Sequence, residues 1–235
     1  MAIDLIPAMT GAEIRGNTPL PSKIAWLSCH FSPWNAGLSN LPEALPEGSV
    51  LILDDSTPPC GHDPGLITAQ LRDTLTAHKC QALLLDFQRR GDPAEAELAA
   101  LLTRALDFPV GISEKYAGAL PGPVFLPPIP PDRPADDYLR PWQSREIWLD
   151  VSPEGLDISL TEQGADFSPL PAWELPAGIV HRDTELLCHY TIEVSDTSAR
   201  FRLCRTQEDL EALVTGVQAL GVTKCFTLWQ EWNRN

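Results

Sequence analysis

The sequence predicts a single α/β domain, a reduced (β/α)8 TIM-like barrel, on three observations. Short apolar runs alternate with helical stretches, the runs are apolar on consecutive positions, and the 235 residues approach the roughly 250 of a complete eight-stranded barrel. Strand–helix–strand order of this kind favours parallel pairing through right-handed crossovers. Because no glycine-rich phosphate turn follows the first run, a barrel is favoured over an open doubly wound sheet. We therefore expect one domain over residues 1–235, with some helices short or missing.

Eight apolar runs are the expected barrel strands. Runs such as VLILD and ALLLDF show no polar alternation, as strands buried on both faces should, and each meets a polar residue at its end. We expect Ile24–Phe31 as the first strand and Lys224–Trp229 as the last, side by side in the ring. The other six are Val50–Asp54, Ala82–Phe87, Pro109–Ser113, Val124–Leu126, Glu146–Val151 and His189–Val194.

Three helices carry recognisable start signals. Asp63 and Asp92 each precede a proline, which is the pattern of an N-cap followed by the first helical residue. Thr206 with Asp209 three residues on resembles a capping box, and Gly221 ends the helix that follows. The expected helices are Pro64–Lys79, Pro93–Leu106 and Leu210–Leu220.

Two segments break the alternation and predict β-hairpins outside the ring. IWLDVSPEGLDISLTEQG is expected to turn at Pro153–Gly155, and YTIEVSDTSARFRLCR at Asp196–Ser198. The linker PPIPPDRPADDYLRP is too rich in proline for a full helix. The predicted barrel therefore has two hairpin excursions and an incomplete helical layer.

The formal net charge is −15. This excess of carboxylates repels phosphate backbones and anionic lipid, so nucleic acid and membrane surfaces are poor partners, whereas a neutral or cationic small ligand stays open. The amino-terminal residues lack a basic start followed by an apolar run, and no stretch is apolar enough to span a bilayer. These features predict a cytoplasmic protein.

The cysteines and histidines indicate neither disulfides nor a metal site. The five histidines show no HxH or HExxH spacing, and the sequence has no Gly-x-Ser-x-Gly elbow or phosphate loop, so we expect no metal and no cofactor. Without an export signal or a paired spacing, six reduced thiols are expected. They are Cys29, Cys60, Cys80, Cys188, Cys204 and Cys225.

Ligands of such barrels bind at the carboxyl ends of the strands. Polar and aromatic side chains follow most of the predicted strands, and they are the candidates for ligand contact or proton transfer. They are His30, Trp34, Asp54, Asp55, Asp86, Glu114, Tyr116, Asp150 and Glu231.

The stretch QALLLDFQ at positions 81–88, followed by a long helix, resembles the motif strand of family 18 glycoside hydrolases, which are chitinase-like barrels. The family strand reads Asp-Gly-x-Asp-x-Asp-aromatic-Glu, so Asp86 aligns with the last Asp, Phe87 with the aromatic and Gln88 with the catalytic Glu. Residues Tyr190–Trp229 resemble the family's closing hairpin, helix and last strand ending in Trp. The two regions together cover about a quarter of the chain.

The resemblance implies a sugar-shaped cleft that lacks the family's general acid. A primary amide at Gln88 cannot give up a proton at a useful pH, and Gln81 and Leu84 stand where two further aspartates would be. The family carries this strand fourth, whereas it is third among the strands predicted above. Aromatic faces that could stack on pyranose rings in such a cleft are those of Trp34, Phe87, Tyr116 and Trp229.

Three functions follow. The leading hypothesis is a glycoside-hydrolase-like barrel that binds a carbohydrate-like ligand or has no catalytic role. The second is an active hydrolase, most plausibly glycosidic, because two carboxylates in unlike environments suffice for an acid and a base; its candidates are Asp54, Asp86, Glu114 and Glu231. The third is a scaffold whose hairpins pair with itself or a partner, since hairpin edges invite strand addition. The oligomeric state is left open.

Overall fold

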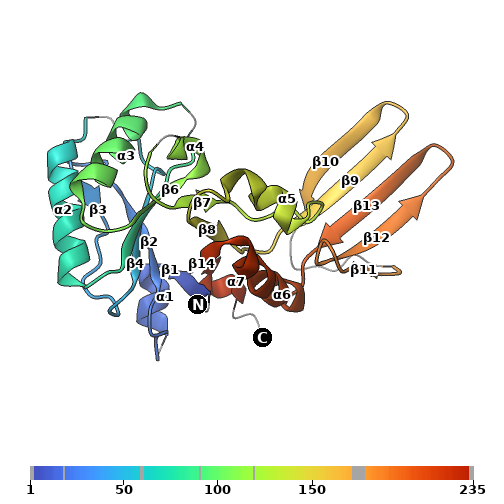
Figure 1. Ribbon diagram of the computed structural model, residues 1–235, viewed down its shortest axis with the longest axis horizontal. Helices are drawn as coiled ribbons and strands as arrows, with labels where there is room; N and C mark the ends of the chain where they lie inside the picture. The colour runs from blue at the N-terminus through green and yellow to red at the C-terminus, as the bar shows by residue number, and fades with distance from the viewer. Residues whose placement is uncertain are drawn as a thin grey trace.

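A closed parallel barrel forms the larger part of the molecule (Figure 1). The computed structural model describes residues 3–17, 19–58, 61–89, 91–118, 120–170 and 178–232. Within them, eight parallel strands close into a ring in the order β1, β2, β4, β5, β6, β7, β8, β14, and a short strand β3 pairs antiparallel to β2 outside it. The bounds are β1 Asp4–Met9, β2 Ala25–Phe31, β3 Leu38–Ser39, β4 Val50–Asp54, β5 Ala82–Asp86, β6 Val110–Ser113, β7 Val124–Leu126, β8 Ile147–Asp150 and β14 Val222–Leu228.

The first barrel strand is β1, which the sequence pattern did not reveal. It lies between β2 and β14 and pairs with both, so the expectation that Ile24–Phe31 comes first and touches the last strand is wrong. The run is only six residues long and contains Pro7, a residue usually excluded from central strands. Counting β1, the strand that carries the QALLLDFQ motif becomes the fourth of the ring, as in the family it resembles.

The predicted N-caps are confirmed, although the third helix begins at Gln207 and not at the expected Leu210. The side chain of Asp63 accepts hydrogen bonds from the backbone N–H groups of Gly65 and Leu66, and Asp92 caps its helix in the same way. Thr206 and Asp209 form a reciprocal capping box. The α-helices are α1 Gly11–Gly16, α2 Pro64–Ala77, α3 Pro93–Ala105, α4 Glu114–Ala117, α5 Ala135–Leu139, α6 Gln207–Val217 and α7 Trp229–Trp232, with short 3₁₀ turns at Arg140–Trp142 and Gln218–Leu220.

A second, antiparallel sheet is inserted between β8 and α6 and projects away from the barrel (Figure 1). Its strands run in the order β10, β9, β13, β12, β11. Their bounds are β9 Gly155–Thr161, β10 Gly164–Leu170, β11 His181–Asp183, β12 Cys188–Val194 and β13 Ser198–Cys204.

This sheet corrects two expectations. The run His189–Val194 belongs to β12 and is not a barrel strand, because the eighth place in the ring is taken by β1. Pro153–Gly155 connects barrel and sheet, and the first hairpin turns between Thr161 and Gly164. The second hairpin turns between Val194 and Ser198, close to the predicted position.

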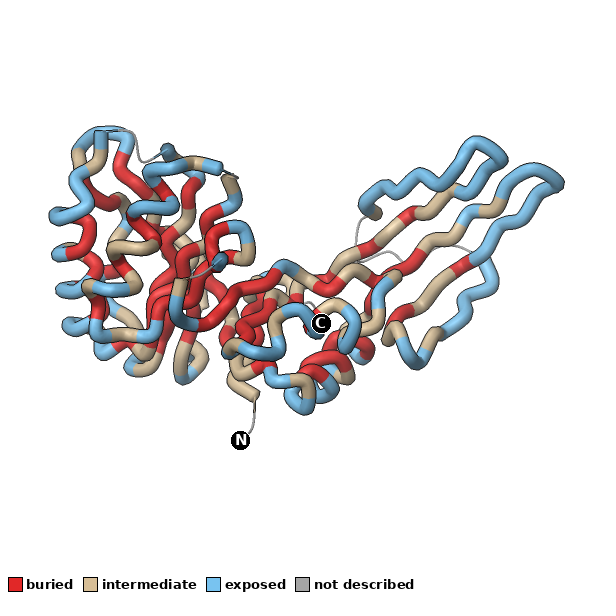
Figure 2. Tube along the Cα trace, turned by 45° about the horizontal axis from the view of Figure 1, so that its top comes forward, coloured by how far each residue is buried: buried red, intermediate tan, exposed pale blue. Residues whose placement is uncertain are grey.

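The core has an inner and an outer part. Inside the ring, Trp148 is fully buried together with Phe226 and smaller apolar side chains, and outside it the strands pack against α2, α3 and α6 (Figure 2). The five cysteines that fall in the described residues are free and buried, in agreement with the predicted reduced thiols, while Cys60 lies outside those residues. None of the described helices is both long and apolar enough to cross a membrane.

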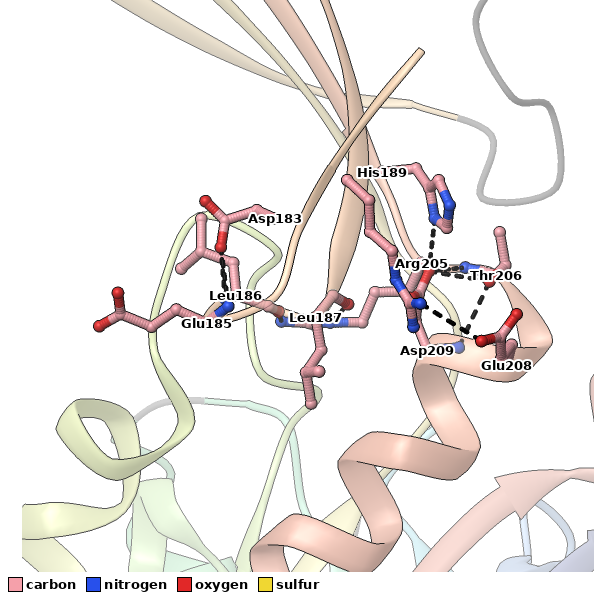
Figure 3. A network of polar contacts seen from close by, with 10 residues as sticks. Asp183, Glu185, Leu186, Leu187, His189, Arg205, Thr206, Glu208 and Asp209 are labelled. Carbon is pink, nitrogen blue, oxygen red and sulfur yellow. Dashed lines mark hydrogen bonds and ion pairs between the residues drawn. The ribbon is translucent and has the colours of Figure 1, made fainter.

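Two buried charged side chains attach the second sheet to the barrel (Figure 3). Arg205, at the end of β13, donates hydrogen bonds to the carbonyls of Leu186 and Leu187 in the sheet and to those of Ile129 and Pro130 after β7. Asp209, in the first turn of α6, accepts hydrogen bonds from Thr206 and, at 2.7 Å, from Nδ1 of His189. It also forms an ion pair with Arg182. Together these contacts hold the sheet against α6 and the β7 loop.

Candidate functional site

Three polar side chains form a row across adjacent strands at the carboxyl end of the barrel. His30 lies in register with Asp54, and Asp54 with Asp86. Side chains two residues apart on a strand share a face, and Ile52 and Leu84, two residues before the aspartates, pack inside the ring. The two carboxyl groups therefore face the inner mouth of the barrel.

Gln88 lies beside Asp86 and is held from both ends of its amide. Its Nε2 donates to Oδ1 of Asp86, and its Oε1 accepts a hydrogen bond of 2.6 Å from Nζ of Lys115. Lys115 also donates to the backbone carbonyl of Gln88 at 2.8 Å. An amide suits this position because it accepts from the ammonium and donates to the carboxylate at the same time.

Asp55 supports this arrangement from behind. It is buried, and its Oδ2 accepts the backbone N–H groups of Gln88 and Arg89 at 2.8 and 2.7 Å. Both hydrogen bonds fix the loop that leaves β5, and with it the position of Gln88. Asp55, predicted to contact ligand, therefore positions the loop.

Asp86 and Asp150 line one small cavity of about 110 Å3 in the mouth, with Leu84, Ser152 and Phe226 among its walls. Burial raises the pKa of Asp86, while the hydrogen bond from Gln88 opposes the rise. Burial also raises the pKa of Asp150 to about 6, helped by the charges of Asp86 and Glu231 and opposed by Ser152. This cavity is smaller than the roughly 300–1,000 Å3 of most ligand pockets, so it holds at most a small group of a larger ligand.

Because the pKa of Asp150 is raised, replacing this residue should increase the free energy of unfolding, and by an amount that depends on pH. The folded pKa of about 6 exceeds the unfolded value of 3.8, so this carboxyl lowers the free energy of unfolding as pH rises through that window. We expect Asp150→Asn, whose Oδ1 can still accept from Ser152, to gain about 1–2 kcal/mol near pH 8 and nothing near pH 4. Urea denaturation at both pH values measures this, and Asp107→Asn controls for the loss of one exposed negative charge. An equal gain at both pH values would contradict the assignment.

A larger groove of about 570 Å3 adjoins this cavity. Asp150 and Ser152 line the cavity, and the next residues, Pro153 and Glu154, line the groove. The groove lies between the loop after β7, the base of the second sheet and the end of β14. Its further walls are Pro130, Pro131, Leu156, Phe167, Pro169, Leu170 and Glu231. The lining is mostly apolar and includes the carboxyl groups of Glu154 and Glu231.

Two of the predicted ligand-stacking aromatics are core residues. Phe87 is fully buried and packs on Phe31 and edge-on to Tyr116 on the outer side of the strands. Tyr116 is buried too, and its hydroxyl contacts the carboxylate of Glu95 at 2.6 Å. Phe87 is one residue from Asp86 and Gln88, so its side chain points to the opposite face. The expectation that Phe87 and Tyr116 line a cleft is wrong.

The other predicted residues lie around the mouth without converging. Trp34 stands in the loop after β2 with 89% of its surface exposed, and it lines neither cavity. Trp229 is half-buried at the start of α7. Glu114 begins α4, and its charge helps burial to raise the pKa of Tyr138. Of the candidate acids Asp54, Asp86, Glu114 and Glu231, Asp86 lines the small cavity and Glu231 lines the groove. Among the described residues, no three His, Cys, Asp or Glu side chains are arranged to hold a metal ion.

Comparison with known proteins identifies the barrel. No family model matches the sequence, and no curated protein matches it. Solved structures do match. The chitinase from Chromobacterium violaceum matches with a TM-score of 0.62 at 11% identity, over 99% of this chain and 96% of that one. The chitinase-like agglutinin from Robinia pseudoacacia has a TM-score of 0.63 at 10% identity, over 100% and 96%. A mutant GH18 chitinase from Cycas revoluta, in complex with (GlcNAc)4, has 0.60 at 10%, over 96% and 94%. The fold is therefore that of the chitinase-like barrels.

Proposed function

We propose that this protein binds a carbohydrate-like oligosaccharide at the carboxyl end of the barrel and does not hydrolyse it. The observation that carries the proposal is the amide of Gln88, held between Asp86 and Lys115 at the end of the fourth barrel strand. An amide there can orient a ligand through hydrogen bonds but has no proton to give a leaving group.

The surroundings of Asp86 favour binding over family 18 chemistry. Leu84 lies two residues before it on the same face and is buried, so β5 itself supplies no second carboxylate where the family strand carries an aspartate. In the family reaction the Glu protonates the leaving oxygen while the substrate's own acetamido group attacks, supported by the Asp. Without that Glu, Asp86 is left with a hydrogen-bonding role.

The adjoining groove offers what an oligosaccharide needs. A pyranose presents an apolar face and a rim of hydroxyls, and the groove is lined both by Phe167 and proline rings and by the carboxyl groups of Glu154 and Glu231. Two of the structurally similar proteins are a chitinase-like agglutinin and a chitinase in complex with (GlcNAc)4. For this chain we infer a ligand of the same chemical class, lying from the mouth into the groove.

Calorimetric titration with (GlcNAc)4 tests the proposal. We expect wild-type protein to bind, and Phe167→Ala to bind at least about tenfold more weakly, a loss of about 1.4 kcal/mol. Leu66→Ala, which removes a comparably exposed apolar side chain from α2, should bind as wild type does. Failure of wild-type protein to bind (GlcNAc)4 would refute an N-acetylglucosamine ligand, and unchanged binding by Phe167→Ala would refute the groove.

An N-acetylglucosaminide reporter substrate tests the second part of the proposal, that the protein does not hydrolyse its ligand. We expect no turnover by wild-type protein and weak turnover at best by Gln88→Glu, because Lys115 would hold the new carboxyl ionised. A hydrolase remains the second candidate, since Asp150, with its pKa of about 6, and Asp86 border one cavity as an acid and a base would. Robust wild-type turnover that survives Gln88→Ala but not Asp150→Asn would favour that candidate.

A further inference from the structure

The second sheet has one apolar face, which we call the apolar sheet face. In the register of the pairs, Phe167 lies opposite Ile158, Ile158 opposite Phe201, and Phe201 opposite Ile192. The rows on either side of this one are apolar as well. On four of the five strands this face consists of Leu156, Ile158, Leu160, Ala165, Phe167, Pro169, Tyr190, Ile192, Val194, Ala199, Phe201 and Leu203. The short edge strand β11 adds His181, which stacks on Tyr190, and Asp183 at the base.

The opposite face of the same sheet is polar, and its charged side chains pair within the sheet or, for Arg182 and His189, with Asp209 of α6. Asp157 is buried and accepts two hydrogen bonds from Nε of Arg200, at 2.8 and 3.0 Å, and Arg202 pairs with Glu193 at 3.0 Å. An antiparallel sheet normally solvates its polar face and packs its apolar face on a second layer. Here the polar side chains have partners, and in the part of the chain that the structure describes no second layer covers the outer half of the apolar face.

The outer half of the apolar sheet face is exposed. Val194 keeps 75% of its surface accessible, Ile192 42% and Leu160 39%. Figure 1 shows α5 and α6 only at the base of the sheet, and Figure 2 shows the hairpin ends exposed. None of the described helices or strands lies over this half. The base, by contrast, borders the groove through Leu156, Phe167 and Pro169.

We propose that the apolar sheet face is a self-association surface, where the same face of a second copy of this chain supplies the missing layer. Two amphipathic antiparallel sheets pack face to face about 10 Å apart as a β-sandwich, and one patch on both copies satisfies a two-fold axis. On β9, β10, β12 and β13 no charged side chain belongs to the face, and Asp183 of β11 lies at its base, so a contact through the outer half buries no charge although each chain carries a net charge of −15.

The size of the face indicates a weak dimer. Four strands of seven residues span about 19 Å by about 23 Å, which gives about 900 Å2 of flat surface from both copies. Protruding side chains increase that area, but Leu203 at the base is already buried, so the contact stays near or below the roughly 1,000 Å2 at which specific interfaces begin. We expect a micromolar dissociation constant. The net charge of each copy opposes association, so added salt should strengthen the dimer.

Sedimentation equilibrium of the full chain, from about 1 to about 200 µM, tests the proposal at low and high salt. Wild-type protein should pass from monomer to dimer across this range, at lower concentration in high salt. Ile192→Lys and Val194→Lys each change an exposed residue, and each should shift the midpoint at least about tenfold upward because the pairing would bury a charge. Leu66→Lys is the matched control, because Leu66 lies on α2 and is 41% exposed, close to the 42% of Ile192. This variant should dimerise as wild-type protein does.

Thermal unfolding of each variant shows whether the fold is intact. A wild-type protein that stays monomeric at the highest concentration in high salt overturns the proposal, as does a dimer that both lysine variants leave unchanged. If the monomer instead co-sediments with neutral phosphatidylcholine vesicles and the lysine variants do not, the face docks on lipid and self-association is wrong. Because the lysine variants leave Phe167 and the groove unchanged, their titration with (GlcNAc)4 separates failure of this proposal from failure of the binding site.

Discussion

Replacing Gly111 with alanine is expected to destabilise the barrel by about 3 kcal/mol or more, because overpacking of a rigid core is costly. Gly111 lies on the inner face of β6, where an added Cβ would stand 2.3 Å from Cε3 and Cζ3 of Trp148. The indole is fully buried, is packed against Phe226, and is fixed by a hydrogen bond of 2.9 Å from its Nε1 to Glu146. Neither the strand backbone nor the ring can move without disturbing the centre of the ring of strands. Urea denaturation measures the loss.

A matched glycine and a compensating variant separate this contact from the general effect of adding a methyl group. Gly216 lies in α6 with no atom within 4 Å of the added Cβ, so Gly216→Ala should be neutral or stabilise by about 0.5–1 kcal/mol. Trp148→Phe shrinks the ring, so Gly111→Ala should cost less in that background than in wild type. Strictly additive losses would show that the contact with Trp148 is not the cause.

The sequence predicts those parts of the fold that rest on local signals. N-caps such as Asp63 and Thr206 satisfy the first N–H groups of their own helices, so α2 and α6 follow the predicted caps. Consecutive apolar residues mark a strand that is covered on both faces, so β5 lies where expected. The strand β1 has no comparable signal, since it is short and contains a proline, and only its pairing with β2 and β14 makes it a strand. The same limit applies to β12, whose apolar run fits a barrel strand equally well.

The candidate site divides in the same way. Residues two apart on a strand share a face, which places Asp86 and Gln88 together. By the same rule Phe87, which lies between them, points to the opposite face and is excluded from the mouth. Phe167 could not be predicted, because it reaches the groove only through the pairing of β10 with β9 and the position of the second sheet. The role of Ser152 was not predicted, because a hairpin turn was expected at Pro153–Gly155. This segment instead connects the barrel to the second sheet, and it borders the groove just after Ser152 lines the small cavity.

The position of that second sheet depends on Arg205, which is only 3% exposed although it is charged. Its guanidinium donates to four carbonyls, two after β7 and two in the turn before β12, and so joins two segments about 60 residues apart in the chain. A planar group with five N–H donors can serve four acceptors at once, which no other side chain can. Because the groove lies between the same β7 loop and the base of the sheet, this side chain also sets its width.

Arg205→Met keeps much of the apolar volume and removes every donor, and we expect it to lower the free energy of unfolding by about 3–5 kcal/mol. Arg205→Lys should fall between this variant and wild type, because an ammonium reaches fewer carbonyls. Arg140→Met is the matched control, since Arg140 is exposed on the surface beside α5 and its ion pairs with Asp136 and Asp137 contribute little. Hydrogen exchange should show the amides of β12 and of the β7 loop opening first in Arg205→Met, and (GlcNAc)4 should bind it more weakly even where it is folded. Wild-type stability and exchange in Arg205→Met would mean that apolar packing alone positions the sheet.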